Sequence, residues 1–176
     1  SMRISVNLSP VQFKNAGLVQ VVVSALATSG LAPQRLELEI TETALLEDSD
    51  ATLNVLYRLR ELGVRIAMDD FGTGYSSLAY LQSFPFDRIK IDRSFIRDIA
   101  EGAGSLNIVR AVAALARGLG METTAEGVET SEQLDTVKSE GCTEMQGFLF
   151  SRPRPAHELG EFFQGMENPQ VGASAA

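Results

Sequence analysis

Two adjacent carboxylates, Asp69 and Asp70, end an apolar run and stand directly before a loop rich in glycine and hydroxyl groups, in the stretch MDDFGTGYSSL. Neighbouring negative charges repel each other, and they are stable together where water or a cation screens them. The pair is therefore either a solvated turn or part of a cation site. Side chains elsewhere in the chain favour the second interpretation.

Polar side chains also lie near the ends of five other runs of β-type sequence: Asn7, Glu39, Lys90, Glu126 and Gln146. If the strands are parallel, their carboxyl ends meet at one end of the sheet, and these side chains converge on one centre. Several carboxylates with one lysine cannot stay ionised in a buried site without compensation. Divalent cations supply it, and oxygen ligands suit Mg²⁺ or Mn²⁺. Two such ions form the clamp used in phosphoryl displacement, so phosphate ester hydrolysis is the leading prediction.

Strand and helix patterns alternate along the chain. The β-type runs are RISVNLS, RLELEIT, VRIAMDD, RIKIDRS, METTAEGV and CTEMQGFLF. Apolar residues at helical spacing predict helices over 18–27, 51–62 and 108–119. Thr130 and Gln133 form a capping box that predicts the start of a further helix. Strands separated by helices imply right-handed crossovers and a parallel sheet, so the fold class is α/β.

Each predicted strand alternates apolar and polar residues. In the second, Leu38 and Ile40 share one face and Glu37 and Glu39 share the other. Helices would cover the apolar face, and the polar faces of all the strands would point at a common centre. This pattern favours a (β/α)₈ barrel of the TIM type over an open sheet, with the site at the carboxyl ends of the strands.

Composition limits the classes of protein that the chain can belong to. With 176 residues and 44% hydrophobic content it predicts one globular domain. The net charge of −8 is unfavourable for binding to the phosphates of DNA. A single cysteine, Cys142, excludes an intramolecular disulfide and a thiolate zinc cluster. No apolar run approaches the ~20 residues of a membrane-spanning helix. We expect a cytoplasmic domain without direct membrane contact, although a parent protein could be tethered to a membrane.

Five ordered motifs carry a family resemblance: VNLSP, LELEITET, MDDFGTGYSSLAYLQSFPFDRIKIDRSFI, TTAEGVET and MQGFLFSRP. With this order and spacing the chain resembles the EAL domain of bacterial cyclic di-GMP phosphodiesterases. The resemblance implies a (β/α)₈ barrel that uses two Mg²⁺ or Mn²⁺ ions to hydrolyse one phosphodiester of cyclic di-GMP to linear pGpG. It also implies that a sensory or GGDEF-type domain is attached in the parent protein.

The resemblance assigns roles to particular residues. The metal ligands by position are Asn7, Glu39, Asp69, Asp70 and Glu126. Lys90 resembles the lysine that orients the nucleophilic water, and Gln146 resembles a glutamine near that water. Glu42 resembles the glutamate that anchors the DFGTGYSS loop, and Glu129 a glutamate that supports the metal site. The expected catalytic residues are thus Lys90, Glu126 and Glu129.

The resemblance also sets expected domain boundaries. The Glu-Ala-Leu segment that names the family is missing from this sequence, and it would stand upstream of Arg3. Residues 3–167 are therefore expected to form an EAL domain that lacks its first two strands, an incomplete barrel with about six of eight strands. Residues 1–2 are interpreted as a tag remnant and a start methionine, and 168–176 as a flexible tail.

Two alternatives stay open. Taken singly, Glu39 could be a surface carboxylate and Lys90 a salt-bridge partner at a barrel rim. As a whole, the chain could be a non-catalytic cyclic di-GMP receptor or a protein-interaction module of the EAL fold. An incomplete barrel would have two unpaired sheet edges, which predicts a homodimer.

Overall fold

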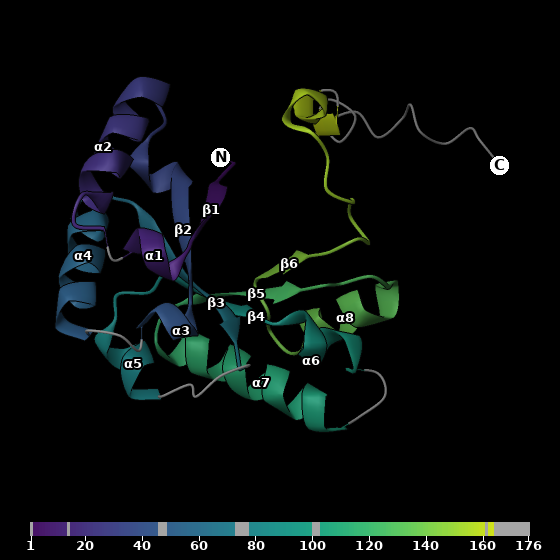
Figure 1. Cartoon of the computed structure of the whole chain (residues 1–176). Coiled ribbons are helices and arrows are strands. Elements are labelled where there is room, and N and C mark those ends of the chain that lie inside the picture. The colour runs from purple at the N-terminus through teal and green to yellow at the C-terminus, as the bar shows by residue number, and fades with distance from the viewer. Residues whose placement is uncertain are drawn as a thin grey trace.

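The computed structural model describes residues 2–13, 15–45, 49–72, 78–99, 103–160 and 162–163. Six parallel strands form one sheet, in which strands that follow one another in sequence are neighbours in space. The strands are β1 (Ile4–Leu8), β2 (Leu36–Thr41), β3 (Arg65–Phe71), β4 (Arg88–Ile91), β5 (Glu122–Glu126) and β6 (Glu144–Gln146). The sheet curls like part of a barrel wall, with the helices on its outer side (Figure 1).

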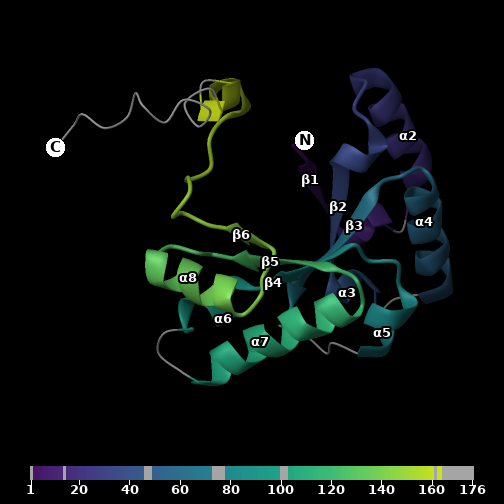
Figure 2. The same ribbon diagram turned by 180° about the vertical axis from the view of Figure 1, so that it is seen from behind.

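Helices follow the strands and cover the outer face of the sheet in both views (Figures 1 and 2). The α-helices are α1 (Pro10–Phe13), α2 (Leu18–Ser29), α3 (Glu42–Leu45), α4 (Ser49–Glu61), α5 (Leu78–Ser83), α6 (Arg93–Arg97), α7 (Ala103–Gly118) and α8 (Ser131–Ser139). The described residues also form two 3₁₀ turns, η1 (Pro33–Arg35) and η2 (Ala156–Glu158).

The core lies between the sheet and this helical layer. Ile40 on β2, Ile66 on β3 and Ile89 on β4 are fully buried, because their positions point toward the helices. From the other side, α4 buries Leu56 and Leu59, which are three positions apart and so lie on one helix face. Truncating a fully buried leucine of this kind to alanine typically costs about 2–5 kcal/mol of stability. The apolar face expected from alternation is confirmed.

The predicted elements are present, and some differ in extent. Gln133 and Thr130 form the capping box at the start of α8, as their spacing predicts. The short helices α1, α3, α5 and α6 are additional to the sequence prediction, because they contain too few turns to show a periodicity. The last strand is shorter than its apolar run predicts. After Gln146 the chain turns, and the Leu149 N–H donates to Val128 O in place of a longer β6.

A layer of charged side chains lies inside the sheet near the amino ends of the strands. It contains Arg3, Glu37, Arg65, Arg88, Glu122 and Glu144. Arg88 is 4% exposed, and its Nη2 donates to Glu122 Oε2 at 2.7 Å. Its Nη1 donates to Glu144, and its Nε lies 3.2 Å from Glu37 Oε2. Formal charges balance in this layer, because its three arginines face three glutamates.

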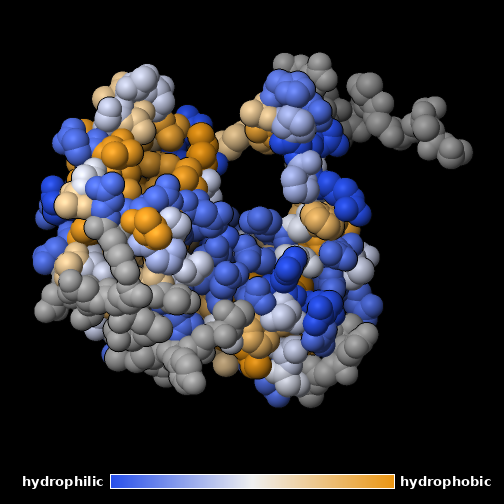
Figure 3. Space-filling model, in the orientation of Figure 1, coloured by the Kyte–Doolittle hydropathy of each residue, from blue (hydrophilic) through white to orange (hydrophobic). Residues whose placement is uncertain are grey.

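The segment after β6 stands away from the sheet, and the molecule is hollowed between this segment and the side formed by α2 and β1 (Figure 3). Hydrophobic atoms gather over that side, where Ile4 and Val6 are 47% and 43% exposed. The hollow is a cavity of about 910 Å³ whose lining includes Glu39, Lys90 and Gln146. The inner, polar face of the sheet is therefore accessible to a ligand.

Candidate active site

The site centres on Lys90, which is 5% exposed and points to the inside of the sheet from β4. Its Nζ lies 2.7 Å from Glu39 Oε2, from Asp69 Oδ1 and from Glu126 Oε1. These carboxylates come from β2, β3 and β5, so one ammonium group joins the ends of four neighbouring strands. An ammonium group has three hydrogens to donate, and each has an acceptor here. The predicted convergence of these four side chains is confirmed.

Asn7 joins this cluster from the edge strand β1. With its amide oriented so that the nitrogen faces the carboxylates, it donates to Asp69 Oδ2 at 3.2 Å and to Glu39 Oε2 at 3.3 Å. Asn7 and Glu39 are direct partners in the β1–β2 register, which places them side by side. To share a cation with Glu39 and Asp69, the amide would have to take the opposite orientation, with its oxygen toward the carboxylates.

Asp70 reaches the site through a backbone irregularity. Simple alternation would place neighbouring residues Asp69 and Asp70 on opposite faces of β3. The pairing of β3 with β4 shifts register between Met68 and Phe71, and Asp70 has a φ of 54°. A left-handed residue in a bulge turns its side chain relative to regular strand geometry. Aspartate is one of the few residues other than glycine that adopts this conformation readily.

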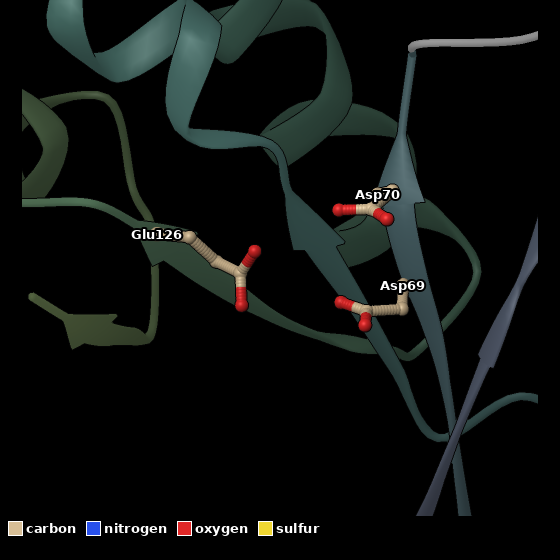
Figure 4. Close-up of side chains that lie close together, drawn as sticks. All are labelled: Asp69, Asp70 and Glu126. Atoms are coloured by element: carbon tan, nitrogen blue, oxygen red, sulfur yellow. The ribbon is translucent and has the colours of Figure 1, made fainter. Parts of the chain in front are cut away.

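Three carboxylates form a group that could hold a metal ion. Oxygens of Asp69, Asp70 and Glu126 all lie within 4.8 Å of one another. In the close-up, Glu126 extends from β5 toward Asp69 and Asp70 on β3, so that the three carboxylates face a common space (Figure 4). Carboxylate oxygens are hard ligands of the kind that Mg²⁺ and Mn²⁺ prefer. The donor set therefore fits a divalent cation.

The electrostatics of the cluster disfavour the ionised forms of Glu126 and Asp70 and favour the protonated form of Lys90. Burial alone would lower the pKa of Lys90, but its hydrogen bonds to Asp69, Glu126 and Glu39 raise it above its ordinary value. Burial raises the pKa of Glu126, and the hydrogen bond from Lys90 only partly offsets this. Burial, followed by the negative charge of Asp69, also raises the pKa of Asp70. Two carboxylates are thus held in surroundings that a further cation would relieve.

The remaining predicted site residues lie at different depths around this centre. Gln146 is exposed at the end of β6 and lines the same cavity as Lys90. Glu42 is 5% exposed and begins α3, directly after β2. Of the DFGTGYSS loop that it is predicted to anchor, residues 73–77 lie outside the described residues. Glu129 is exposed, and its backbone N–H donates to Gln133 Oε1 at 2.8 Å. Its supporting role stays a prediction.

Sequence reasoning did not assign Asp92 or the charged layer to the site. Asp92 caps α6, where its Oδ1 accepts from the Ser94 N–H at 2.9 Å, and its charge contributes to the raised pKa of Asp70. It continues the alternation of Lys90 two residues later, and that spacing is the signal that could have found it. The charged layer has the same kind of signal, because Glu37 and Arg88 precede Glu39 and Lys90 by two residues.

These features define a class of protein: a (β/α)-barrel-type domain with an acidic, cation-binding type of site at the carboxyl ends of its strands. The chain belongs to the EAL domain family, which matches residues 1–153. It is 57% identical to uncharacterized protein y4lL of Sinorhizobium fredii over 88% of this chain and 19% of that protein. It is 48% identical to cyclic di-GMP phosphodiesterase NbdA of Pseudomonas aeruginosa over 93% of this chain and 21% of that protein.

Solved structures agree with this placement. The PaMucR phosphodiesterase in complex with c-di-GMP is 48% identical and has a TM-score of 0.85, over 89% of this chain and 64% of that chain. A manganese and cy-diGMP complex of BlrP1 from Klebsiella pneumoniae is 38% identical with a TM-score of 0.80, over 86% of this chain and 39% of that chain. The barrel-type fold expected from the sequence is confirmed. The chain spans about a fifth of the length of the curated relatives it matches.

Proposed function

We propose that this chain belongs to a metal-dependent phosphodiesterase that hydrolyses one phosphodiester of cyclic di-GMP to linear pGpG in bacterial signalling. The observation that carries the proposal is the cluster of Asp69, Asp70 and Glu126 beside Lys90, at the carboxyl ends of the strands of an EAL domain. The names of two relatives support the substrate, because NbdA is a cyclic di-GMP phosphodiesterase and PaMucR is solved in complex with c-di-GMP.

The ligand set is proposed to hold two Mg²⁺ or Mn²⁺ ions. Its members are Asn7, Glu39, Asp69, Asp70 and Glu126. When bound, such ions lower the pKa of water and neutralise charge that develops on a phosphate during displacement. The manganese complex of BlrP1 supports this choice of cation.

The side chains around the proposed ions would have separate roles in hydrolysis. Lys90, with its raised pKa, stays protonated, and to orient water or a phosphate oxygen it would exchange one of its three carboxylate acceptors for that group. Glu126 is proposed to combine its place in the ligand set with a catalytic role at the cluster. Gln146 reaches the same cavity from β6 and is proposed to position the water. Glu42 and Glu129 are proposed to support the loop and the metal site from outside the cluster.

The test is hydrolysis of cyclic di-GMP by this chain with Mg²⁺ or Mn²⁺, followed by chromatography for pGpG. The same assay is run with any sequence that precedes Arg3 in its gene, with EDTA, and with Asp69→Asn. The matched control is Asp98→Asn, which removes an exposed carboxylate on a helix end. We expect metal-dependent turnover that Asp69→Asn lowers at least about 100-fold, since a metal ligand is lost. Binding of cyclic di-GMP without turnover in every preparation would favour the receptor function instead.

We also propose an attached domain and a cellular location for the parent protein. Pseudomonas aeruginosa MucR is a bifunctional diguanylate cyclase and phosphodiesterase, which supports a GGDEF-type domain in the parent of this chain. We propose a cytoplasmic location, where cyclic di-GMP would be the ligand. Among the described residues, no helix is both long and apolar enough to cross a membrane.

A homodimer is proposed from the edges of the sheet. β1 and β6 are the outer strands of the described sheet, and Ile4 and Val6 on β1 are 47% and 43% exposed. An exposed, apolar edge strand is a surface on which a second copy of the chain can pair. Sedimentation at rising protein concentration tests this, and a monomer at the highest concentration would contradict it.

A further inference from the structure

We propose that Arg3 is a positioning residue of the candidate metal site, because its guanidinium ties the strand of Asn7 to the strand of Glu126. The proposal rests on the metal-dependent function proposed above. It concerns a residue on the far layer of the sheet interior, which contacts none of the proposed metal ligands itself in the described hydrogen bonds and ion pairs.

Asn7 is held less closely in the cluster than Lys90 is. It lies on β1 opposite Glu39 in the β1–β2 register. The bonds of the Asn7 amide to Asp69 and Glu39 are 3.2 and 3.3 Å, longer than the 2.7 Å contacts that Lys90 makes with the same two carboxylates. The position of Asn7 therefore depends on what else fixes β1.

Arg3 supplies that restraint from the start of the strand. Its Nη1 donates to Glu122 Oε2 at 2.8 Å, and its Nη2 donates to Glu144. Glu122 begins β5 and Glu144 begins β6, so these bonds cross the sheet interior from the first strand to the last two. Arg3 is 119 positions from Glu122 and 141 positions from Glu144 in sequence, and the curl of the sheet brings them together.

The contacts of Arg3 can affect the site because the charged layer and the cluster around Lys90 are carried by the same strands. Asn7 follows Arg3 by four residues, and Glu126 follows Glu122 by four residues. At about 3.3 Å per residue, each pair spans about 13 Å along its strand. A shift of the Arg3 end of β1 relative to Glu122 would therefore also displace the end that carries Asn7 relative to Glu126.

The chemistry of the contact favours arginine at this position. A planar guanidinium presents separate donors to two carboxylates, whereas the lysine ammonium is a single point charge. Arg3 and Glu122 have side chains that are 27% and 37% exposed, and partly exposed ion pairs contribute little to overall stability. We therefore expect substitution of Arg3 to move β1 and weaken metal binding more than it lowers the Tm.

The experiment compares Arg3→Met, which keeps an aliphatic stem, with Arg3→Lys and with the unsubstituted chain. Arg110→Met is the matched control, because Arg110 forms a similar forked pair with Glu140 on the surface. Hydrogen exchange of the β1 amides reports the strand, titration with Mn²⁺ alone reports the site, and the Tm reports overall folding. In Arg3→Met we expect faster β1 exchange and a Kd for Mn²⁺ raised about 10-fold, the lower end of the effect of removing a direct partner of a metal ligand.

Arg3→Lys should lie between Arg3→Met and the unsubstituted chain, and Arg110→Met should match the unsubstituted chain. Unchanged β1 exchange in Arg3→Met would overturn the inference, whether or not Mn²⁺ binds. Faster exchange with an unchanged Kd would also overturn it, because Arg3 would then be structural only. Failure of the unsubstituted chain to bind Mn²⁺ would instead overturn the proposed function, and the role of Arg3 at a metal site with it.

Discussion

The ammonium nitrogen of Lys90 lies 2.7 Å from Oδ1 of Asp69, and both residues are less than 10% exposed. The same nitrogen contacts Glu39 and Glu126 at 2.7 Å, so one cation balances part of the charge of three carboxylates. This arrangement holds the carboxylates close together before any metal ion is bound. It explains how a chain can place so many like charges at one end of a folded sheet.

Lys90→Met is expected to destabilise the metal-free protein. Removing one partner from a buried ionic cluster leaves uncompensated charge, which costs about 3–5 kcal/mol. Urea unfolding in EDTA measures this cost, with Lys138→Met on the exposed face of α8 as the control. Because the cluster becomes more negative, we also expect Mn²⁺ to raise the Tm of Lys90→Met more than that of the unsubstituted chain. An equal shift in the two proteins would contradict this electrostatic account.

Asp70→Asn is expected to raise the Tm of the metal-free protein at pH 7. The pKa of Asp70 is raised by burial and by Asp69, so its ionised form is less favourable in the folded than in the unfolded chain. Asparagine removes that charge and adopts the left-handed φ of 54° readily. Thermal unfolding in EDTA tests the effect, and Asp98→Asn should not show it. The same substitution should weaken Mn²⁺ binding, and a lower Tm in EDTA would argue against the prediction.

The charged layer predicts a loss of stability in acid. Burial alone would raise the pKa of Glu122, but the Arg3 hydrogen bond and the charges of Arg65 and Arg88 lower it below its ordinary value of 4.5. A carboxyl with a lowered folded-state pKa stabilises the protein fully above its unfolded-state pKa, about 4.5 here. That contribution disappears as the pH falls through the lower, folded-state pKa.

The test follows the Tm of the unsubstituted chain and of Glu122→Gln from pH 7 to pH 3. We expect Glu122→Gln to unfold at a lower temperature at pH 7 and the gap to narrow toward pH 3. Glu61→Gln, at the exposed end of α4, serves as the control and should show little gap at any pH. A gap for Glu122→Gln that stays constant across this range would show that the carboxyl is not stabilised by its arginines.

Gly147→Ala is expected to be strongly destabilising. A Cβ at this position would lie 2.1 Å from Val128 O and 2.3 Å from Val128 N, and neither backbone atom can move away freely. Overpacking of this kind typically costs about 1–3 kcal/mol, and the backbone contact places Gly147 at the upper end. Gly104→Ala in α7 is the matched control, because apart from its chain neighbours and its own helix backbone no atom lies within 4 Å of its added Cβ. It should be neutral or stabilising in urea unfolding, and equal effects of the two substitutions would refute the packing argument.

The alternation of residues along each strand was enough to predict which side chains face the site. Glu39, Lys90 and Glu126 each lie on the polar side of a strand pattern, and strand parity is a local property that neighbouring residues reveal. The capping box at Thr130 was predictable for the same reason, since its two partners are three residues apart. Local spacing therefore determined the strands, the longer helices, the inner face and most of the proposed ligands.

Tertiary structure decided the features that depend on strands far apart in sequence. Parity would have turned Asp70 away from Asp69, and only the register shift between β3 and β4 brings its carboxylate back into the cluster. The contact of Arg3 with Glu144 spans 141 positions and needs the curl of the whole sheet. Spacing along the chain carries no measure of that curl, because it results from the packing of every strand against its neighbours and against the helices outside.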